Sequence, residues 1–504
     1  MTDANRRSFL TTTAATGSVL GLSELGLLTG LPQARAEDKA GRVPLRPEIE
    51  PLVRLLEETP RDRVLEEFAD RIRKGASYQD VMAALMLAAV CNVQPRPSVG
   101  FKFHAVLVVN SCHLASLAGP DSERWLPVFW ALDHFKSSQA SNKREGNWRM
   151  PPVDEAKVPP ARKARQMFIN AMDNWDEAAA DVAVASLARH ASDHELFELF
   201  CRYGSRDFRS IGHKAIFVAN GWRTIRVIGR EHAEPILRSL AYALLNHDGG
   251  NPAKRDDPAD VPGRENKQLA GTIRDDWRGG ETSEAATAEL LATLRDGSPA
   301  DASKQVAALL NKGVSPQSVW DGLFLGAGEL LMRQPGIVGL HTLTTTNAMH
   351  FAYSSSADDH TRRWLMLQNA AFLTMFRGAM HGRGKVGDAR VDKLDAVDPS
   401  AKGDGAVGEI MADVSRDRTS AARKTLAFAK VGDPYRLIDA ARLLVFHKGN
   451  DSHDYKFSSA VLEDFAHVSP AWRGRFLAAS MFQLEGSGKR DTPLIERTRA
   501  ALKG

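Results

Sequence analysis

Apolar residues recur at spacings of three and four along most of the chain, which is the period of α-helices that bury one face. The pattern is clearest from Leu52 to Lys74 and from Ala288 to Lys312. Each stretch ends at a glycine, Gly75 or Gly313, which suits the left-handed turn that closes many helices. Alternating patterns joined by Asn-Gly or Asp-Gly turns, which predict β-hairpins, are scarce. The chain is therefore predicted to be all-α.

Helix starts are indicated by short polar side chains whose oxygen accepts a hydrogen bond from a free backbone N–H. A proline follows two of these residues at the first helical position, where a missing N–H costs nothing. Stretches rich in Pro, Gly, Lys, Arg and Asp are predicted to be loops: 141–165, 246–281 and 382–405. The residues expected to cap helices are Ser77, Asp193, Ser315 and Asp433.

A series of short segments recurs in the same order about 240 residues later in the chain. The frame His-x5-Asn-x2-His-x-Ala, for example, occurs from His104 to Ala115 and again from His341 to Ala352. The ordered series predicts an internally duplicated helical domain with pseudo-twofold symmetry. The expected parts are helical repeat 1 at 50–247, a linker at 248–287, helical repeat 2 at 288–485 and a C-terminal tail at 486–504.

The N-terminus resembles a twin-arginine export signal. Asn5-Arg6-Arg7-Ser8-Phe9-Leu10 carries the paired arginines, a mildly apolar run follows, and Ala34-Arg35-Ala36 has the small residues that signal peptidase reads. A membrane anchor needs an apolar run of about 20 residues, and this run is short and contains Glu24. We therefore expect residues 1–36 to be a signal peptide for the twin-arginine export machinery, the mature protein to be periplasmic or otherwise exported, and no stable membrane anchor to be present.

The charge balance and the cysteine count limit the kinds of molecule that the protein is expected to bind. The 504 residues include 66 Lys and Arg and 62 Asp and Glu, a balance that does not favour a nucleic-acid-binding surface. Three cysteines are too few for a disulfide scaffold or for a four-cysteine zinc or iron–sulfur site. We therefore expect a small-molecule substrate and no nucleic-acid partner.

The repeated frames place histidines in apolar or hydroxyl-bearing helical surroundings, where a buried polar group needs a partner. His104 and His113 are nine residues apart, about 900° of helix rotation, so one regular helix directs them to opposite faces. Either His104 lies just before the helix or the two histidines have different roles. The candidate metal ligands are His104, His113, His341 and His350.

A histidine-rich site with few carboxylates favours iron, copper or zinc over magnesium or calcium. The helical signatures of zinc proteases and di-iron bundles, HExxH and Glu-x-x-His, are absent from the sequence.

Three further residues are candidates for catalysis. His213 and His453 match at an offset of 240, and Glu329 is a carboxylate on an otherwise apolar helix, either ion-paired or held for acid–base work.

The order of these elements resembles the questin oxidase-like family of helical proteins. The resemblance rests on the frame from His341 to Tyr353, on His213-Lys214 before an apolar helix, and on His453-Asp-Tyr-Lys456. It implies oxidative chemistry, such as ring opening, on a hydrophobic or aromatic substrate between the helices. The family's link to NADPH does not suit an exported protein, because that compartment holds no nicotinamide pool.

The leading functional hypothesis is an exported oxidoreductase with a histidine-lined pocket that could bear a transition metal. Its neutral histidines would ligate the metal or transfer protons, because imidazole titrates near neutral pH. Two alternatives stay open. One is a non-catalytic helical binding or scaffold protein whose histidines are structural, and the other is a metal-dependent hydrolase.

Overall fold

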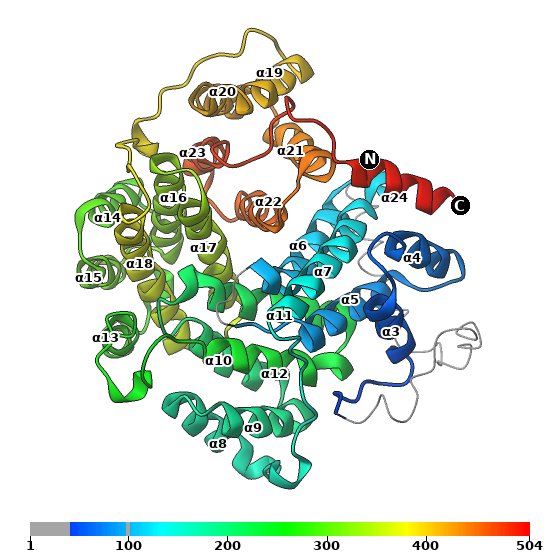
Figure 1. Cartoon of the computed structure of the whole chain (residues 1–504). Coiled ribbons are helices and arrows are strands. Elements are labelled where there is room, and N and C mark those ends of the chain that lie inside the picture. The colour runs from blue at the N-terminus through cyan, green and yellow to red at the C-terminus, as the bar shows by residue number, and fades with distance from the viewer. Residues whose placement is uncertain (1–40, 97–100) are drawn as a thin grey trace.

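The computed structural model describes residues 41–96 and 101–504. These residues form twenty-two α-helices and no β-strand (Figure 1), so the predicted all-α class is confirmed. No helix within these ranges combines the length and the apolar character that crossing a membrane requires. The predicted signal peptide at 1–36 lies outside the described residues.

Short connections join most of the helices, and longer ones span residues 145–160, 245–260, 271–283 and 382–403. In the first half of the chain they are α3 (Glu50–Glu58), α4 (Val64–Arg73), α5 (Tyr78–Asn92), α6 (His104–Ala118), α7 (Leu126–Arg144), α8 (Ala161–Asn174), α9 (Glu177–His190), α10 (Asp193–Gly204), α11 (His213–Ile228) and α12 (Ala233–Leu244). In the second half they are α13 (Val261–Ala270), α14 (Glu284–Asp296), α15 (Pro299–Asn311), α16 (Pro316–Arg333), α17 (Ile337–Ser355), α18 (Asp359–His381), α19 (Asp404–Val414), α20 (Arg418–Val431), α21 (Pro434–Lys448), α22 (Ser452–Asp464), α23 (Pro470–Ser480) and α24 (Pro493–Lys503).

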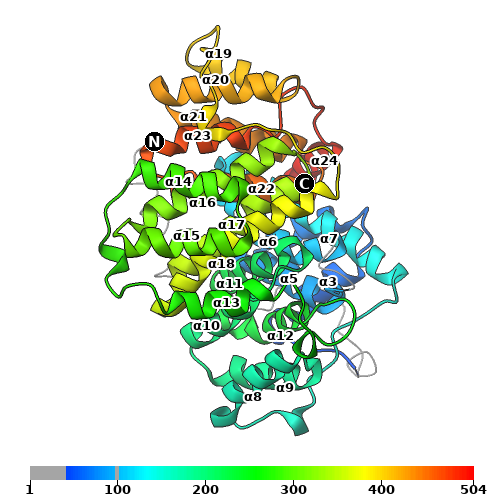
Figure 2. The same ribbon diagram turned by 90° about the vertical axis from the view of Figure 1, so that its left-hand side faces the viewer.

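Four helices, α6, α11, α17 and α22, form a closed ring in the middle of the molecule. Helix α6 packs against α11 and α22, and α17 packs against the same two helices. Figure 1 shows how α22, from near the end of the chain, comes to lie beside α6. The other helices surround this ring, with the α8–α9 pair at one end of the molecule and α19–α20 at the other (Figures 1 and 2).

The local signals at the helix ends work largely as predicted. Ser77, Ser315 and Asp433 cap α5, α16 and α21, each accepting a hydrogen bond from a backbone N–H of the first turn. The expected cap at Asp193 is wrong by one residue, because the Ser192 hydroxyl accepts from the Glu195 amide and Asp193 is already helical. A side-chain oxygen at either position can reach a backbone N–H of the first turn, and here the serine hydroxyl accepts that hydrogen bond.

The two long amphipathic stretches are each divided into two helices. Residues 52–74 break at Pro60 and residues 288–312 at Gly297 to Pro299, because proline supplies no backbone N–H to continue a helix. The second helix of each pair ends as expected at a glycine with positive φ, 103° at Gly75 and 88° at Gly313. In both turns the glycine N–H and the next N–H bond back to carbonyls of the last turn.

The stretch 248–287, expected to be a linker, contains α13 and is packed into the protein. Asn266 donates a hydrogen bond to the Gln368 side chain at 2.8 Å, and Trp277 is fully buried. The tail at 486–504 likewise contains α24, which packs against α4 and carries Arg497 beside Glu66 (Nη2–Oε2 2.8 Å). A single large hydrophobic cluster extends from Ile49 to Ile495, so the two halves share a core.

The turn at Gly313 gives a stability test. We predict that Gly313→Ala lowers the free energy of unfolding by about 1–2 kcal/mol, because an L-residue resists positive φ. The matched control is Gly378→Ala, at an exposed helical position with open space around the added methyl, where alanine stabilises a helix by up to about 1 kcal/mol. Urea denaturation of both variants measures the difference, and an equal effect at the two positions would contradict the assignment.

Candidate metal centre

Each helix of the central ring carries one histidine near its N-terminus. His104 and His213 are the first residues of α6 and α11, His453 is the second residue of α22, and His341 lies in the second turn of α17. The four side chains are between 0 and 6% exposed. They are His104, His213, His341 and His453, and we call them the four-histidine cluster.

The imidazoles of the cluster form a closed circuit. Neighbouring ring centroids lie 4.4 to 5.2 Å apart around the order His104, His213, His341, His453. One ring nitrogen from each residue lies within 4.8 Å of the other three. Two of these approaches are close: His213 Nε2 lies 3.2 Å from His104 Nε2 and 3.1 Å from His341 Nε2.

Hydrogen bonds fix the orientation of three of these rings. His213 Nδ1 lies 2.6 Å from the Ser210 carbonyl, and His341 Nδ1 lies 2.5 Å from the Ile337 carbonyl. A carbonyl oxygen only accepts, so both Nδ1 atoms must carry the proton. His453 Nδ1 meets a carboxylate oxygen of Asp451 at 2.5 Å, which places its proton in the same way.

The fixed tautomers make the contact between His213 and His341 informative. Each ring is protonated at Nδ1, so the two Nε2 atoms face each other at 3.1 Å with lone pairs and no hydrogen between them. Such a contact is repulsive in a protein without a cation. Two nitrogen ligands at the usual zinc–nitrogen distance of about 2.0–2.1 Å lie about 3.3 Å apart in a tetrahedron, close to the observed spacing.

The electrostatics keep the imidazoles neutral and available as ligands. Burial is the main cause that holds the pKa of all four below its ordinary value of 6.5, and the positive charge of Lys456 contributes. Burial also lowers the pKa of Lys456 itself to about 7. Metal-bound histidines commonly donate their second N–H to a carbonyl or carboxylate, and three members of the cluster do so. The buried histidine group could therefore hold a metal ion.

A narrow polar cavity lies between the same four helices, one to two turns beyond the histidines. It is lined by Asn110 of α6, Asn220 of α11, Thr344 of α17 and Lys456 of α22, among others. Its volume is about 10 Å³. A single water molecule needs a space of about this size, so the cavity suits a ligand no larger than water.

A strained turn directs His213 into the cluster. Ser210 and Ile211 both have positive φ, 51° and 46°, which is an outlier for a β-branched residue. Gly212 follows at φ 79°, and a Cβ at this position would collide with the Thr345 hydroxyl of α17. Backbone strain of this kind is commonly retained at functional sites. Here it brings the Ser210 carbonyl onto His213 Nδ1.

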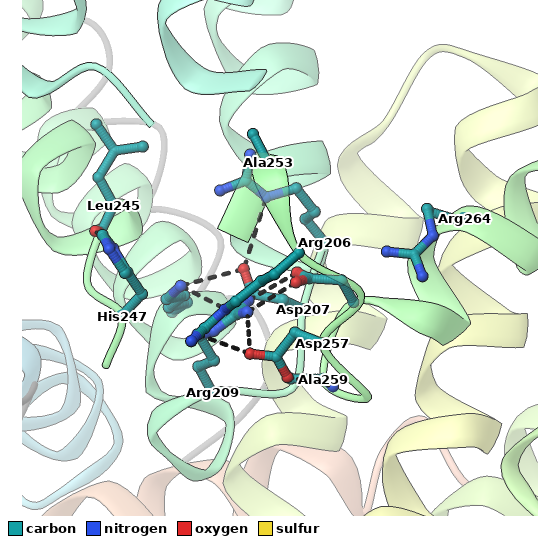
Figure 3. A network of polar contacts seen from close by, with 12 residues as sticks. Arg206, Asp207, Arg209, Leu245, His247, Ala253, Asp257, Ala259 and Arg264 are labelled. Atoms are coloured by element: carbon teal, nitrogen blue, oxygen red, sulfur yellow. Dashed lines mark hydrogen bonds and ion pairs between the residues drawn. The ribbon is translucent and has the colours of Figure 1, made fainter. Parts of the chain in front are cut away.

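A network of buried charges holds this turn from the other side (Figure 3). Arg209 bonds Asp260 at 2.7 Å and Asp257 at 3.0 Å. The fully buried Asp207 carboxylate accepts two hydrogen bonds from Lys214 Nζ, at 2.9 and 3.1 Å. Although burial by itself raises the pKa of the Asp207 carboxyl, the surrounding cations lower it below its ordinary value of 3.8. The turn before His213 is thus fixed by ion pairs as well as by packing.

Two of the predicted ligands lie elsewhere. His113, nine residues after His104 on α6, has its Nδ1 3.0 Å from the Tyr78 hydroxyl. His350 packs against Trp320 of α16 and lies beside His467, with ring centroids 4.6 Å apart. Histidines nine residues apart on one helix do point to opposite faces, as the sequence predicted. In each of the two repeated frames, the first histidine belongs to the four-histidine cluster and the second has other surroundings.

The carboxylate of Glu329, a predicted catalytic group, is held by ion pairs and hydrogen bonds. Its oxygens accept from Arg295 Nε and Nη2 at 2.7 and 2.6 Å and from the Val391 amide at 3.0 Å. Asp392 also pairs with Arg295. These contacts join α14 and α16 to the segment before α19, which accounts for a buried carboxylate in an apolar helix.

Sequence reasoning did not select several groups around the candidate centre. Lys456 ends the run that begins at His453, and Asp451 lies two residues before that run. The Asp-x-His spacing was the available signal for a carboxylate that orients an imidazole. The Ser210 and Ile337 carbonyls carry no residue-type signal. Asp464 approaches His350 only through the packing of α22 against α17.

Comparisons of this chain with protein-family models, curated proteins and solved structures gave no match in any of the three. The resemblance to the questin oxidase-like family therefore stays a prediction, and the chemistry has to be argued from the site itself.

The Asp207 network yields a second prediction. Asp207→Asn keeps the side-chain shape but leaves Lys214 as a buried charge without its counter-ion, so we expect the free energy of unfolding to fall by about 3–5 kcal/mol. The matched control is Asp256→Asn, which removes an exposed partner of Arg264 and should change stability by less than about 1 kcal/mol. Denaturant titration of both variants decides, and a similar loss in each would refute the assigned role.

Glu329→Gln provides a third prediction. The substitution weakens the buried ion pair with Arg295, which keeps Asp392 as a second partner. We therefore expect a loss of about 1.5–3 kcal/mol in unfolding free energy with no change in the metal content of the four-histidine cluster. Thermal unfolding and metal analysis of the same preparation test both parts. A variant that keeps full stability but loses activity would instead favour the acid–base role predicted from the sequence.

Proposed function

We propose that the protein binds one first-row transition metal ion at the four-histidine cluster and uses it in an oxidation–reduction reaction of a small molecule. The observation that carries this proposal is the contact of His213 Nε2 with His341 Nε2 at 3.1 Å, where both atoms present lone pairs. Four imidazoles without a carboxylate in the set suit iron, copper or zinc. Copper or iron would supply the redox chemistry.

The small size of the nearby cavity limits any reactant that would bind in it, beside the centre. A space of about 10 Å³ is about the size needed for one water molecule, so an aromatic ring is too large for it. The hydrophobic or aromatic substrate implied by the family resemblance would therefore bind outside this cavity. Lys456 lines the space with a buried amine, which would hold or donate a proton beside a small molecule bound there.

A structural ion is the second candidate. Four protein ligands complete a tetrahedron, which is typical of structural zinc sites, whereas catalytic zinc sites keep one position for water. An ion here would join helices from both halves of the chain, α6 and α11 to α17 and α22. The same complete set of ligands makes a metal-dependent hydrolase the least supported of the three alternatives.

The wider hypothesis includes an internal duplication and export. Under the proposed duplication, α6 with His104 corresponds to α17 with His341, and α11 with His213 corresponds to α22 with His453. The meeting of the two pairs in one cluster supports this relation, because each half then supplies two ligands. Export by the twin-arginine machinery would carry the folded, metal-loaded protein to the periplasm. This part rests on the sequence of residues 1–36.

The proposal is tested by metal analysis of the protein purified from its native compartment and of variants. We expect His341→Ala and His213→Ala each to lose about one equivalent of metal per chain, because the remaining imidazoles no longer complete the set. His113→Ala is the matched control, since its ring contacts Tyr78 rather than the cluster, and it should keep the wild-type content.

The identity of the metal separates the two candidate functions. Copper or iron that changes oxidation state reversibly supports the oxidoreductase, and zinc alone, with a large loss of thermal stability on its removal, supports the structural ion. Less than about 0.2 equivalents of metal in the wild-type protein, with no change in the His341→Ala variant, would contradict both.

A further inference from the structure

A second group of metal-ligating side chains lies toward the other end of α17, apart from the four-histidine cluster. One ligand atom each from His350, Asp464 and His467 lies within 4.8 Å of the other two. His350 belongs to α17, Asp464 is the last residue of α22, and His467 lies in the connection to α23. Three residues from different segments thus converge on one point.

The Asp464 carboxylate is the most informative member of this group. Its residue is fully buried, and its Oδ1 accepts a hydrogen bond from Asn347 Nδ2 at 2.8 Å. The other oxygen, Oδ2, is also buried and has no hydrogen-bond partner in the described part of the chain. A buried polar oxygen without a partner is costly whether or not the carboxyl group is ionised, so this atom indicates a missing ligand.

Arg223 lies near this group, but its positive charge is offset and does not exclude a cation. Arg223 donates to Asn347 Oδ1 at 3.3 Å, but it is also ion-paired with Glu463 (Nη2–Oε2 2.9 Å), which offsets its charge. Asn347 donates to both Glu463 and Asp464, and so holds the two carboxylates in place. Because Arg223 offsets the charge of Glu463, Asp464 is the carboxyl group that remains for a cation next to His350.

The group is open to solvent on one side. His467 is exposed and forms part of the wall of a surface cavity of about 730 Å³ between α14, α16 and the start of α23. Ser283, Gln317 and Asp321 line the same cavity and give it a polar character. An ion bound by His467 would be accessible from this cavity, in contrast to one held in the fully buried four-histidine cluster.

We propose that His350, Asp464 and His467 form a second metal site, which binds a divalent first-row transition ion. Two imidazoles and one carboxylate are a ligand set used by catalytic zinc and by non-haem iron, with further positions left for water or substrate. The site takes its ligands from the second half of the chain alone. It is independent of the proposed function of the four-histidine cluster.

The test is a titration of the metal-free, full-length chain with Zn²⁺ against a chromophoric chelator, followed by Co²⁺ absorption spectra. We expect the wild-type chain to bind two equivalents. His467→Ala and Asp464→Asn should each bind one equivalent fewer, or bind the second ion at least tenfold more weakly. His467 is exposed, so its truncation leaves the fold intact, and Asp464→Asn retains an oxygen for the bond from Asn347. His194→Ala, at another exposed histidine, is the matched control and should bind two.

The outcomes separate the two sites. An equivalent that is lost in His467→Ala but kept in His341→Ala supports the second site, whether or not the four-histidine cluster binds metal. Unchanged stoichiometry and affinity in both His467→Ala and Asp464→Asn, or a wild-type chain whose bound metal is lost entirely in His341→Ala, would overturn it.

Discussion

The contact between two imidazole nitrogens at the centre of the helical ring is the interaction on which the surrounding structure depends. Backbone carbonyls hold the Nδ1 protons of His213 and His341, so their Nε2 lone pairs face each other across 3.1 Å in the buried core. Neither nitrogen can rotate away without losing its carbonyl bond. A cation bound between them would turn a repulsive contact into two coordinate bonds, and it would also account for the close gathering of four neutral imidazoles.

The rest of the fold can be understood as the support for this arrangement. The closed ring of α6, α11, α17 and α22 brings four helix beginnings to one point. The strained turn at Ser210 to Gly212 is stabilised by packing against Thr345 on one side and by the Asp207 network on the other. Strain of this kind persists only where neighbouring contacts over-determine it, and these contacts come from both halves of the chain.

The sequence was sufficient for the helical class and for most of the local signals. Helical periodicity, serine and aspartate caps, and glycine at helix ends are short-range effects, and they identify Ser77, Ser315, Gly75 and Gly313 correctly. The predictions that failed also involve neighbouring residues. Ser192 rather than Asp193 caps α10, and proline divides each of two stretches that the apolar periodicity predicts as one helix.

The candidate site was accessible from the sequence only in part. The repeated frame and the offset of 240 selected His104, His341, His213 and His453, but as separate metal and catalytic groups. Their meeting depends on how four helices pack, which spacing along one helix does not specify. The same holds for Asp464 and His467, whose approach to His350 is set by the packing of α22 beside α17 and by the connection that follows.

X-ray absorption spectroscopy of the bound ion tests the central claim most directly. The measurement is best made on the His467→Ala variant loaded with one equivalent of Zn²⁺, so that the second proposed site does not contribute. The account predicts a first shell of four imidazole nitrogens at about 2.0–2.1 Å. A shell dominated by oxygen, or one with fewer than three imidazoles, would contradict it.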